Sequence, residues 1–435
     1  MHHIKGNPGA GLFGATLGFF FGFASVALFG PTAGIFKAAL HLSPEQVGLL
    51  VATPALSGSL LRIPFAAWVD TTGGRKPFLV LLGLSLGGML GLALLVNLFD
   101  PSHAGSSLYP LLLLLGVLCG CGIATFSVGI GQVSYWYAMD AQGQALGIFA
   151  GVGNLAPGLF SFLLPLALAR LRLGGSYLVW LFFLGLGTIL YAFTARNAPF
   201  FQMVANGVPD AEARDEAKAH GQELLPAGSL RESLSISART WKTWLLVALY
   251  FTTFGGFMAL TAWLPIYWHS YFTASAVVAG VLTALYSLLA SAIRIVGGRI
   301  SDRLGGENTA VGSLLLMLLG ALLLTFSANF TLSVASEVLL AVGMGVNNAA
   351  VFKLVPQEVP HAVGGAAGWV GGLGAFGGFA IPPLLGVFVH RQGIQGYASG
   401  FIIFVVLSVI SLLLTAVLKR SGRNGRFRVK PGLQM

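Results

Sequence analysis

The sequence predicts an all-α membrane protein of twelve transmembrane helices, arranged as two pseudo-symmetric six-helix bundles. Of its 435 residues, 56% are hydrophobic and only 9% are charged, whereas a soluble domain is about one quarter charged. Apolar runs of about 18 residues or more, the length that crosses a bilayer as a helix, recur along the whole chain. One long polar stretch, residues 196–242, separates six such runs from six others.

The positions of the apolar runs define the predicted spans. The first run is too long for the apolar region of a signal peptide, and no small-residue cleavage pattern follows it, so we count it as a span. The twelve spans are expected at residues 11–36, 46–69, 77–98, 108–137, 143–168, 175–195, 243–268, 274–298, 309–328, 331–352, 362–389 and 397–418.

These spans divide the chain into four regions. We expect an N-terminal bundle at residues 1–195, a cytoplasmic linker at 196–242, a C-terminal bundle at 243–418 and a basic cytoplasmic tail at 419–435. The linker contains PDAEARDEAKAHGQELL, whose mixed charges predict a short solvated helix. The tail directly follows a span, which favours contact with anionic lipid headgroups over a nucleic-acid partner.

The basic residues predict the orientation. With both termini on one side of the membrane, that side holds 18 of the 24 Lys and Arg residues and the other side holds four. Because cytoplasmic loops are enriched in Lys and Arg, both termini are expected in the cytoplasm and the protein in the cytoplasmic (inner) membrane. The two remaining basic residues, Arg62 and Arg294, lie inside predicted spans.

Arg62 and Arg294 occupy equivalent places in an internal repeat. Asp70 follows Arg62 by eight residues, Asp302 follows Arg294 by eight, and each aspartate precedes a glycine-rich turn. A second pair of segments, GIFAGVGN at 147–154 and GWVGGLGA at 368–375, aligns in the same way. Transporters built from repeats bind their substrate near the midplane, between the repeats.

The depth of the two arginines suggests a ligand. Eight helical residues rise about 12 Å, and half the hydrocarbon thickness is about 15 Å. If Asp70 and Asp302 mark the membrane boundary, both arginines lie near the midplane and face each other across a central cavity. Of 14 Asp and Glu residues, only Glu337 lies inside a span. We therefore expect an anionic substrate, rather than a carboxylate, to neutralise the pair.

The guanidinium group narrows the choice of anion. It is planar, and its paired N–H donors match a planar oxyanion. The spans offer few Asn or Gln partners for a sugar, so a small anion such as nitrate, nitrite or formate fits better. A long hydrophobic anion is the alternative that the 32 phenylalanines leave open.

No pattern of an enzyme is present in the sequence. Cys119 and Cys121 are two residues apart, a spacing that suits neither a disulfide nor a zinc site, and the eight histidines are scattered at ends and loops. No phosphate-binding or dinucleotide-binding fingerprint follows a strand. We expect no catalytic residues, metal or cofactor, and the longest loop is too short for the output domain of a sensor.

Two copies of one loop motif resemble the major facilitator superfamily. They are D-x-x-G-G-R-K at 70–76 and G-x-x-x-D-R-x-G-G at 298–306. The first copy has Ala66 where the motif has glycine, and the second lacks the closing basic pair. The resemblance implies the major facilitator fold, whose halves rock to give alternating access. It also implies gating roles for five motif residues, with simple turn or cap roles as the alternative: Asp70, Gly74, Arg75, Asp302 and Arg303.

Three longer segments resemble the nitrate/nitrite porter family within that superfamily: GIFAGVGNLAPG, AAVFKLVPQEVP and GGAAGWVGGLGAFGGFAIPPLLG. The resemblance implies that Arg62 and Arg294 hold the anion, that Asn154 donates to it, and that aromatic rings flank it, namely Phe126, Tyr250 and Phe254. Glycines make smooth faces along which helices slide, here Gly151, Gly153, Gly372 and Gly374. Pro157 departs from the family's G-N-x-G-G-G pattern.

The sequence therefore predicts a monomeric transporter, not an enzyme, that moves nitrate and/or nitrite by alternating access. Exchange of the two anions is expected because the centre of the predicted pathway lacks an acid. Nitrate–proton symport is the first alternative, with Glu337 as the proton site. A major facilitator carrier of another small anion, such as formate, is the second.

Overall fold

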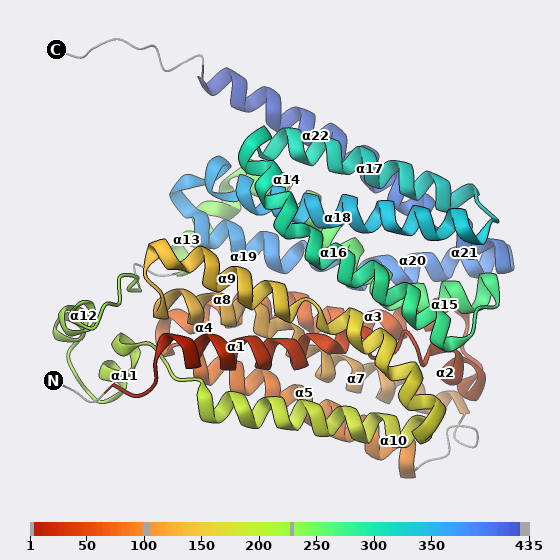
Figure 1. The fold of residues 1–435 in the computed structure, drawn as a ribbon, viewed down its shortest axis with the longest axis horizontal. Helices are drawn as coiled ribbons and strands as arrows, with labels where there is room; N and C mark the ends of the chain where they lie inside the picture. The colour runs from red at the N-terminus through yellow and green to blue at the C-terminus, as the bar shows by residue number, and fades with distance from the viewer. Residues whose placement is uncertain (1–3, 99–104, 227–229, 427–435) are drawn as a thin grey trace.

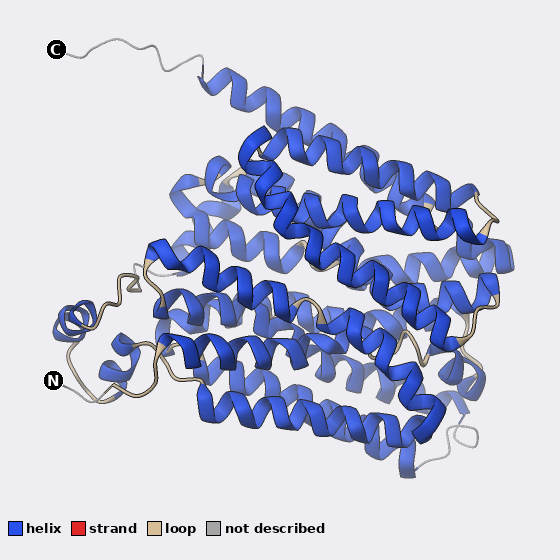
Figure 2. Ribbon diagram, in the orientation of Figure 1, coloured by secondary structure: helices blue, strands red, loops and turns tan. Residues whose placement is uncertain are grey.

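The computed structural model describes residues 4–98, 105–226 and 230–426, and the regular structure within these ranges is helical (Figure 2). One group of helices comprises α1 (Pro8–Phe23), α2 (Ala33–Leu40), α3 (Pro44–Leu60), α4 (Arg62–Thr72), α5 (Arg75–Leu98), α7 (Tyr109–Gly120), α8 (Thr125–Trp136), α9 (Met139–Gly153) and α10 (Ala156–Thr194). A second comprises α14 (Trp241–Tyr250), α15 (Gly256–Phe272), α16 (Ala276–Leu304), α17 (Gly306–Phe326), α18 (Phe330–Glu358), α19 (Val363–Leu373), α20 (Gly377–Gln392), α21 (Gly396–Ser399) and α22 (Ile402–Arg426).

The two groups lie one above the other in Figure 1 and form two bundles. Between them in the chain come α11 (Pro199–Ala205), α12 (Asp210–Ala219) and α13 (Leu230–Arg239). In Figure 1, α11 and α12 lie at the left, beside the N-terminus. We call this the linker end of the molecule, and we call the opposite end the far end.

The number of membrane crossings agrees with the sequence. Eleven helical segments of the described residues are long and apolar enough to cross a bilayer. One of them, Gln144–Thr194, has 51 residues, and as a straight helix it would extend about 76 Å, far beyond the hydrocarbon thickness of about 30 Å. It turns back at Arg172, whose φ is 56° and ψ is −176°, as α10 shows in Figure 1. It therefore crosses twice, and the predicted twelve-helix fold is confirmed.

The first span is shorter than the sequence predicted. It was expected to continue to residue 36, but it runs from Pro8 to Ala27, and a new helix starts at Ala33. Pro31 cannot donate a backbone hydrogen bond and so interrupts the helix. Gly30, just before it, packs so closely on the Ala262 carbonyl that a Cβ would lie 2.5 Å from the oxygen.

Several spans are broken in their middle. The breaks lie at Leu61 between α3 and α4, in the 3₁₀ turn Cys121–Ala124 between α7 and α8, at Asn154 and Leu155 between α9 and α10, and in the π-helical turn Phe251–Gly255 between α14 and α15. Interrupted helices and π turns mark functional sites in many proteins. Each of these breaks lies at or beside a residue expected to bind the anion.

The linker contains three helices, where the sequence predicted one short solvated helix. On α12, Arg214 pairs with Asp210 at 2.6 Å on the surface. In contrast, α13 packs on α19, because the Gly365 amide donates to Ser233 Oγ at 2.9 Å and the Trp369 indole donates to the Leu234 carbonyl at 3.1 Å. The helix expected over PDAEARDEAKAHGQELL corresponds to α12, whereas α13 lies outside that segment and was not predicted. Of the predicted tail, residues 427–435 lie outside the described residues.

The bundles are in close contact at the far end. There Glu45 of α3 pairs with His390 of α20 at 3.1 Å, and Gly48 is so close to α20 that a Cβ would lie 2.5 Å from the Pro382 carbonyl oxygen. On the linker side of the middle, Gly151 of α9 faces open space, with no neighbouring atom within 4 Å of an added Cβ.

Candidate functional site

Arg62 begins α4 and is fully buried. Its Nη1 donates to the Gly371 carbonyl in the other bundle at 2.9 Å, while its Nε and Nη2 have no hydrogen-bond partner. No ion pair joins Arg62 to a carboxylate among the described residues. A buried charge with unmade hydrogen bonds is costly, so this guanidinium is suited to receive an anion.

Phe254 brings the two arginines together. The Arg62 guanidinium carbon lies 5.2 Å from the centre of the Phe254 ring, and that of Arg294 lies 5.6 Å from the same ring. The Phe126 ring lies 5.0 Å from Arg62. The arginines are close enough to repel each other, and each gains from the negative ring face.

The π-helical turn that carries Phe254 is held from two sides. Thr252 accepts a hydrogen bond from Ser411 at 2.9 Å, and Thr253 is hydrogen-bonded to Asn348 Oδ1 at 2.8 Å. A π turn inserts one extra residue into the helix and changes the direction of the side chains around it. We therefore attribute the inward position of the Phe254 ring to this turn.

Tyr250 adds a third unpartnered group. Its side chain is fully buried, its hydroxyl lacks a hydrogen-bond partner, and it lies near enough to Arg62 to interact electrostatically. Its ring stacks on Phe254, with centroids 4.8 Å apart, and meets Phe352 edge-on at 5.0 Å. Arg62 and Tyr250 thus offer donors to one small region between the bundles.

A cavity of about 210 Å³ lies beside these groups. Liquid water occupies about 30 Å³ per molecule, so the cavity has room for a small ion with a few waters. Arg294 belongs both to this cavity and to the aromatic contacts. Both bundles line it, through Gly147, Ala150, Gly151, Asn154, Ser291, Arg294, Ile295, Asn348, Ala349 and Phe352.

Asn154 lines the cavity but does not direct its amide N–H into it. Its Nδ2 donates to the Ala150 carbonyl one turn earlier at 2.6 Å, and its Oδ1 has no partner. Its backbone carbonyl accepts from Ser291 Oγ of the other bundle at 3.0 Å. In this conformation Asn154 joins the bundles, and donation to an anion would require its amide to rotate.

The two aspartates of the repeat have different surroundings. Asp70 is half-buried and accepts a hydrogen bond from the Tyr135 hydroxyl at 2.7 Å. The Asp302 side chain is 72% exposed and pairs with Lys353. Arg303, beside it, is exposed. The sequence repeat therefore does not produce two identical polar contacts.

Arg75 and Gly74 are held against the N-terminal bundle. Arg75 donates from Nε to the Ala195 carbonyl at 3.1 Å and from Nη2 to the Ala192 carbonyl at 2.9 Å. These carbonyls lie at the C-terminal end of α10, which a cation stabilises. A Cβ at Gly74 would lie 2.4 Å from Gln132 Cβ, so only glycine fits there.

The four glycines predicted to form smooth helix faces fall into two groups. A Cβ at Gly153, Gly372 or Gly374 would come within 2.8 Å of a neighbouring side chain, so these positions need glycine for close packing. At Gly151 an added Cβ would meet nothing within 4 Å.

Three groups at this site were not among the predicted residues: the Gly371 carbonyl, Ser291 and Asn348. The pair Asn347–Asn348 inside an apolar span was the signal that could have identified Asn348. Glu337 does not line the cavity; it is buried in α18, and neither carboxyl oxygen has a hydrogen-bond partner.

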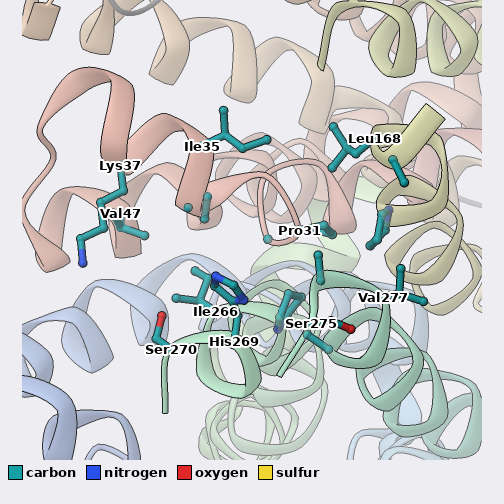
Figure 3. Close-up of a pocket in the computed structure, with 18 residues that line it drawn as sticks. Pro31, Ile35, Lys37, Val47, Leu168, Ile266, His269, Ser270, Ser275 and Val277 are labelled. Atoms are coloured by element: carbon teal, nitrogen blue, oxygen red, sulfur yellow. The ribbon is translucent and has the colours of Figure 1, made fainter. Parts of the chain in front are cut away.

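A larger hollow, of about 500 Å³, lies between the bundles at the far end. Figure 3 shows Pro31, Ile35 and Val47 of one bundle facing Ile266 and Ser275 of the other. Lys37 and His269 also line it. Its walls are mostly apolar and it contains neither arginine, so we place the candidate site at the smaller cavity.

Comparison with protein families gives a match over most of the chain. The model of the Major Facilitator Superfamily matches residues 15–308 and 268–432. The chain is 31% identical to the probable nitrate/nitrite antiporter NarK1 of Thermus thermophilus, covering 92% of this chain and 89% of the relative. It is 28% identical to the probable nitrate transporter NarT of Staphylococcus epidermidis, covering 92% and 94%.

Solved structures share the fold at low sequence identity. A D-xylose–proton symporter superposes with a TM-score of 0.71 at 15% identity, over 93% of this chain and 96% of that one. A bacterial homologue of the lysosomal transporter Spinster superposes with a TM-score of 0.69 at 16% identity, over 99% and 100%.

Proposed function

Because the chain belongs to the Major Facilitator Superfamily, and within it to the family of nitrate/nitrite transporters, we propose that it exchanges nitrate and nitrite across the cytoplasmic membrane by alternating access. It is a multi-pass transport protein, not an enzyme. Its relatives include a probable nitrate/nitrite antiporter and, in Bacillus subtilis, a nitrite extrusion protein 27% identical to it.

The observation that carries this proposal is the donor set around Arg62. Its Nε and Nη2 and the Tyr250 hydroxyl are buried without partners, and Arg294 contacts the same Phe254 ring. A guanidinium binds a planar oxyanion through two parallel N–H bonds. A nitrate or nitrite held between Arg62 and Arg294 would neutralise part of their repulsion and satisfy the free donors, while Phe126 and Phe254 exclude water.

The distribution of basic residues supports a cytoplasmic linker end, with both termini on that side. The far end then faces outward, and the contacts there, Glu45–His390 and Gly48 against α20, close the outer side. Opening would separate these contacts while the bundles, residues 1–195 and 243–418, close over the cavity at the linker end. One chain supplies every residue of the proposed site, which supports a monomer in the lipid bilayer.

Exchange follows from the charge of the empty site. Two unneutralised guanidiniums repel each other and should oppose closure of the bundles around the empty site. A bound anion reduces this repulsion, so the bundles change conformation only when an anion is bound. Proteoliposomes test the idea: nitrate uptake should require internal nitrate or nitrite. Equal uptake into anion-free vesicles would contradict exchange.

Nitrate–proton symport is the second candidate, favoured by the buried, unpartnered carboxyl of Glu337. Accumulation driven by a proton gradient and lost in Glu337→Gln would support it.

Formate as the substrate is tested by competition, because a formate carrier would bind formate more tightly than nitrate.

A further inference from the structure

A second group of unpartnered polar atoms lies away from the arginines. On α18, both carboxyl oxygens of Glu337 and the Ser333 hydroxyl lack hydrogen-bond partners, and on α15 so do the Tyr267 hydroxyl and the Trp268 indole N–H. All four side chains are at most 1% exposed. They are near neighbours: the Trp268 indole is close to the Glu337 carboxyl and the Ser333 hydroxyl is close to that of Tyr267, although neither pair meets the geometry of a hydrogen bond, and Tyr267 interacts electrostatically with Glu337.

The surroundings of Glu337 contain no compensating cation among the described residues. The groups that face it are Tyr267 and Trp268 from α15, with Tyr271 beyond Tyr267, and Tyr286 from α16. The one ionisable residue of α17, Glu307, lies at the opposite end of that helix. A buried carboxylate without a counter-charge is strongly disfavoured, whereas a neutral carboxyl can donate one hydrogen bond and accept others.

We propose that Glu337, Ser333, Tyr267 and Trp268 form a second binding site, which holds one proton and a bridging water. A buried water makes about three hydrogen bonds to groups that are otherwise unsatisfied, and this cluster supplies donors and acceptors from two helices. The indole N–H points to a proton and water rather than a metal cation, because it can only donate. Binding is simple protonation: the carboxylate takes a proton from water on the outer side and returns it there.

Aromatic rings separate this site from the far end. Trp268 and Phe272 of α15 meet Phe330, at the first turn of α18, with ring centroids 5.4 Å apart in each pair. Glu337 lies two helical turns further in. Proton exchange therefore requires the outer ends of α15 and α18 to separate, which we assign to the outward-open conformation.

A column of stacked rings joins the two sites. Tyr286, which faces Glu337, stacks on Phe257 at 6.0 Å, and Phe257 stacks on Phe254 at 5.8 Å. Phe254 contacts both arginines. Movement of α15 against α18 on protonation would shift these rings, so occupancy of the proton site is expected to change anion affinity.

The expected coupling between protonation and anion affinity rests on the proposed anion transport, whereas the proton site itself does not. Two experiments test the proton site and the coupling separately. The first is infrared spectroscopy of the purified protein in lipid vesicles at neutral pH. The wild type should show a carboxylic-acid C=O band that shifts in D₂O and is lost in Glu337→Gln. Asp210→Asn, which removes an exposed, ion-paired acid from the linker, should retain the band. If Glu337→Gln leaves the spectrum unchanged, Glu337 does not hold the proton.

Trp268→Phe provides a second variant should Glu337→Gln fold poorly, since it keeps an aromatic ring while it removes the indole N–H together with part of the ring system. The C=O band should shift in frequency, because a hydrogen bond of the cluster is lost. If the C=O band does not shift, Trp268 is not part of the proton site.

The second experiment measures nitrate affinity against external pH in counterflow. The wild type and Asp210→Asn should show pH-dependent affinity, and Glu337→Gln should lose that dependence while still exchanging anions. Phe257→Leu should lose it too, yet keep the infrared band, because the column is broken and the proton site is intact. Unaltered pH dependence in both Glu337→Gln and Phe257→Leu would overturn the coupling. Failure of every variant and the wild type to transport nitrate would instead refute the proposed function.

Discussion

The Arg62 guanidinium donates to the backbone carbonyl of Gly371 across the interface between the bundles, at 2.9 Å. This one bond fixes the orientation of Arg62 and leaves Nε and Nη2 free of partners. An anion bound there would be attached to both bundles, directly through Arg294 and indirectly through Gly371. In the proposed function, the same side chain would bind the substrate and contact both bundles.

We expect Arg62→Lys and Arg294→Lys each to abolish nitrate transport. Lysine keeps the charge but has a compact head without the paired donors of guanidinium, and charge-assisted hydrogen bonds are worth about 1.5–3 kcal/mol each, so affinity should fall about 10- to 100-fold or more. Nitrate-dependent thermal stabilisation of the purified variants measures this. Wild-type nitrate affinity in both variants would refute the arginine pair as the ligand.

Phe254→Leu should weaken anion binding without unfolding the protein. The ring lies 5.2 Å and 5.6 Å from the two guanidinium carbons, and each cation–π contact is worth about 0.5–2 kcal/mol. The expected loss of nitrate affinity is about tenfold. Phe182→Leu is the control, because that ring is 65% exposed on the outside of the bundle, and its nitrate affinity should be unchanged.

Gly372→Ala and Gly151→Ala should differ in stability. A Cβ at Gly372 would lie 2.7 Å from Ile63 Cγ1, whereas a Cβ at Gly151 would meet nothing within 4 Å. Overpacking costs about 1–3 kcal/mol, so the melting temperature should fall for Gly372→Ala and stay near that of the wild type for Gly151→Ala. Equal melting temperatures would show that the bundles do not pack closely at Gly372.

Replacement of the two repeat aspartates should have unequal effects. Asp70→Ala removes a half-buried acceptor and leaves the Tyr135 hydroxyl unpaired, at a cost of about 1–3 kcal/mol. Asp302→Ala breaks an exposed ion pair with Lys353, worth about 0–1 kcal/mol. Thermal unfolding of both variants measures the difference, and a larger loss for Asp302→Ala would contradict the observed surroundings.

The sequence predicted the fold because its main signals are local. Hydropathy and run length determine which segments become spans, and the first span ended early only where Pro31 interrupts the helix. The eight-residue spacing from Arg62 to Asp70, repeated from Arg294 to Asp302, indicated that the arginines occupy equivalent depths. The family resemblance added the aromatic residues, of which Phe126 and Phe254 contact a guanidinium.

Which donor meets which acceptor was decided only by the tertiary structure. The sequence could not show that Asn154 bonds to its own helix, that the Gly371 carbonyl takes one donor of Arg62, or that Tyr250 keeps a free hydroxyl. Hydrogen bonds depend on ångström-scale distances between residues far apart in the chain, and a repeat in sequence does not fix these distances. For the same reason Asp70 and Asp302 match in sequence and differ in their contacts.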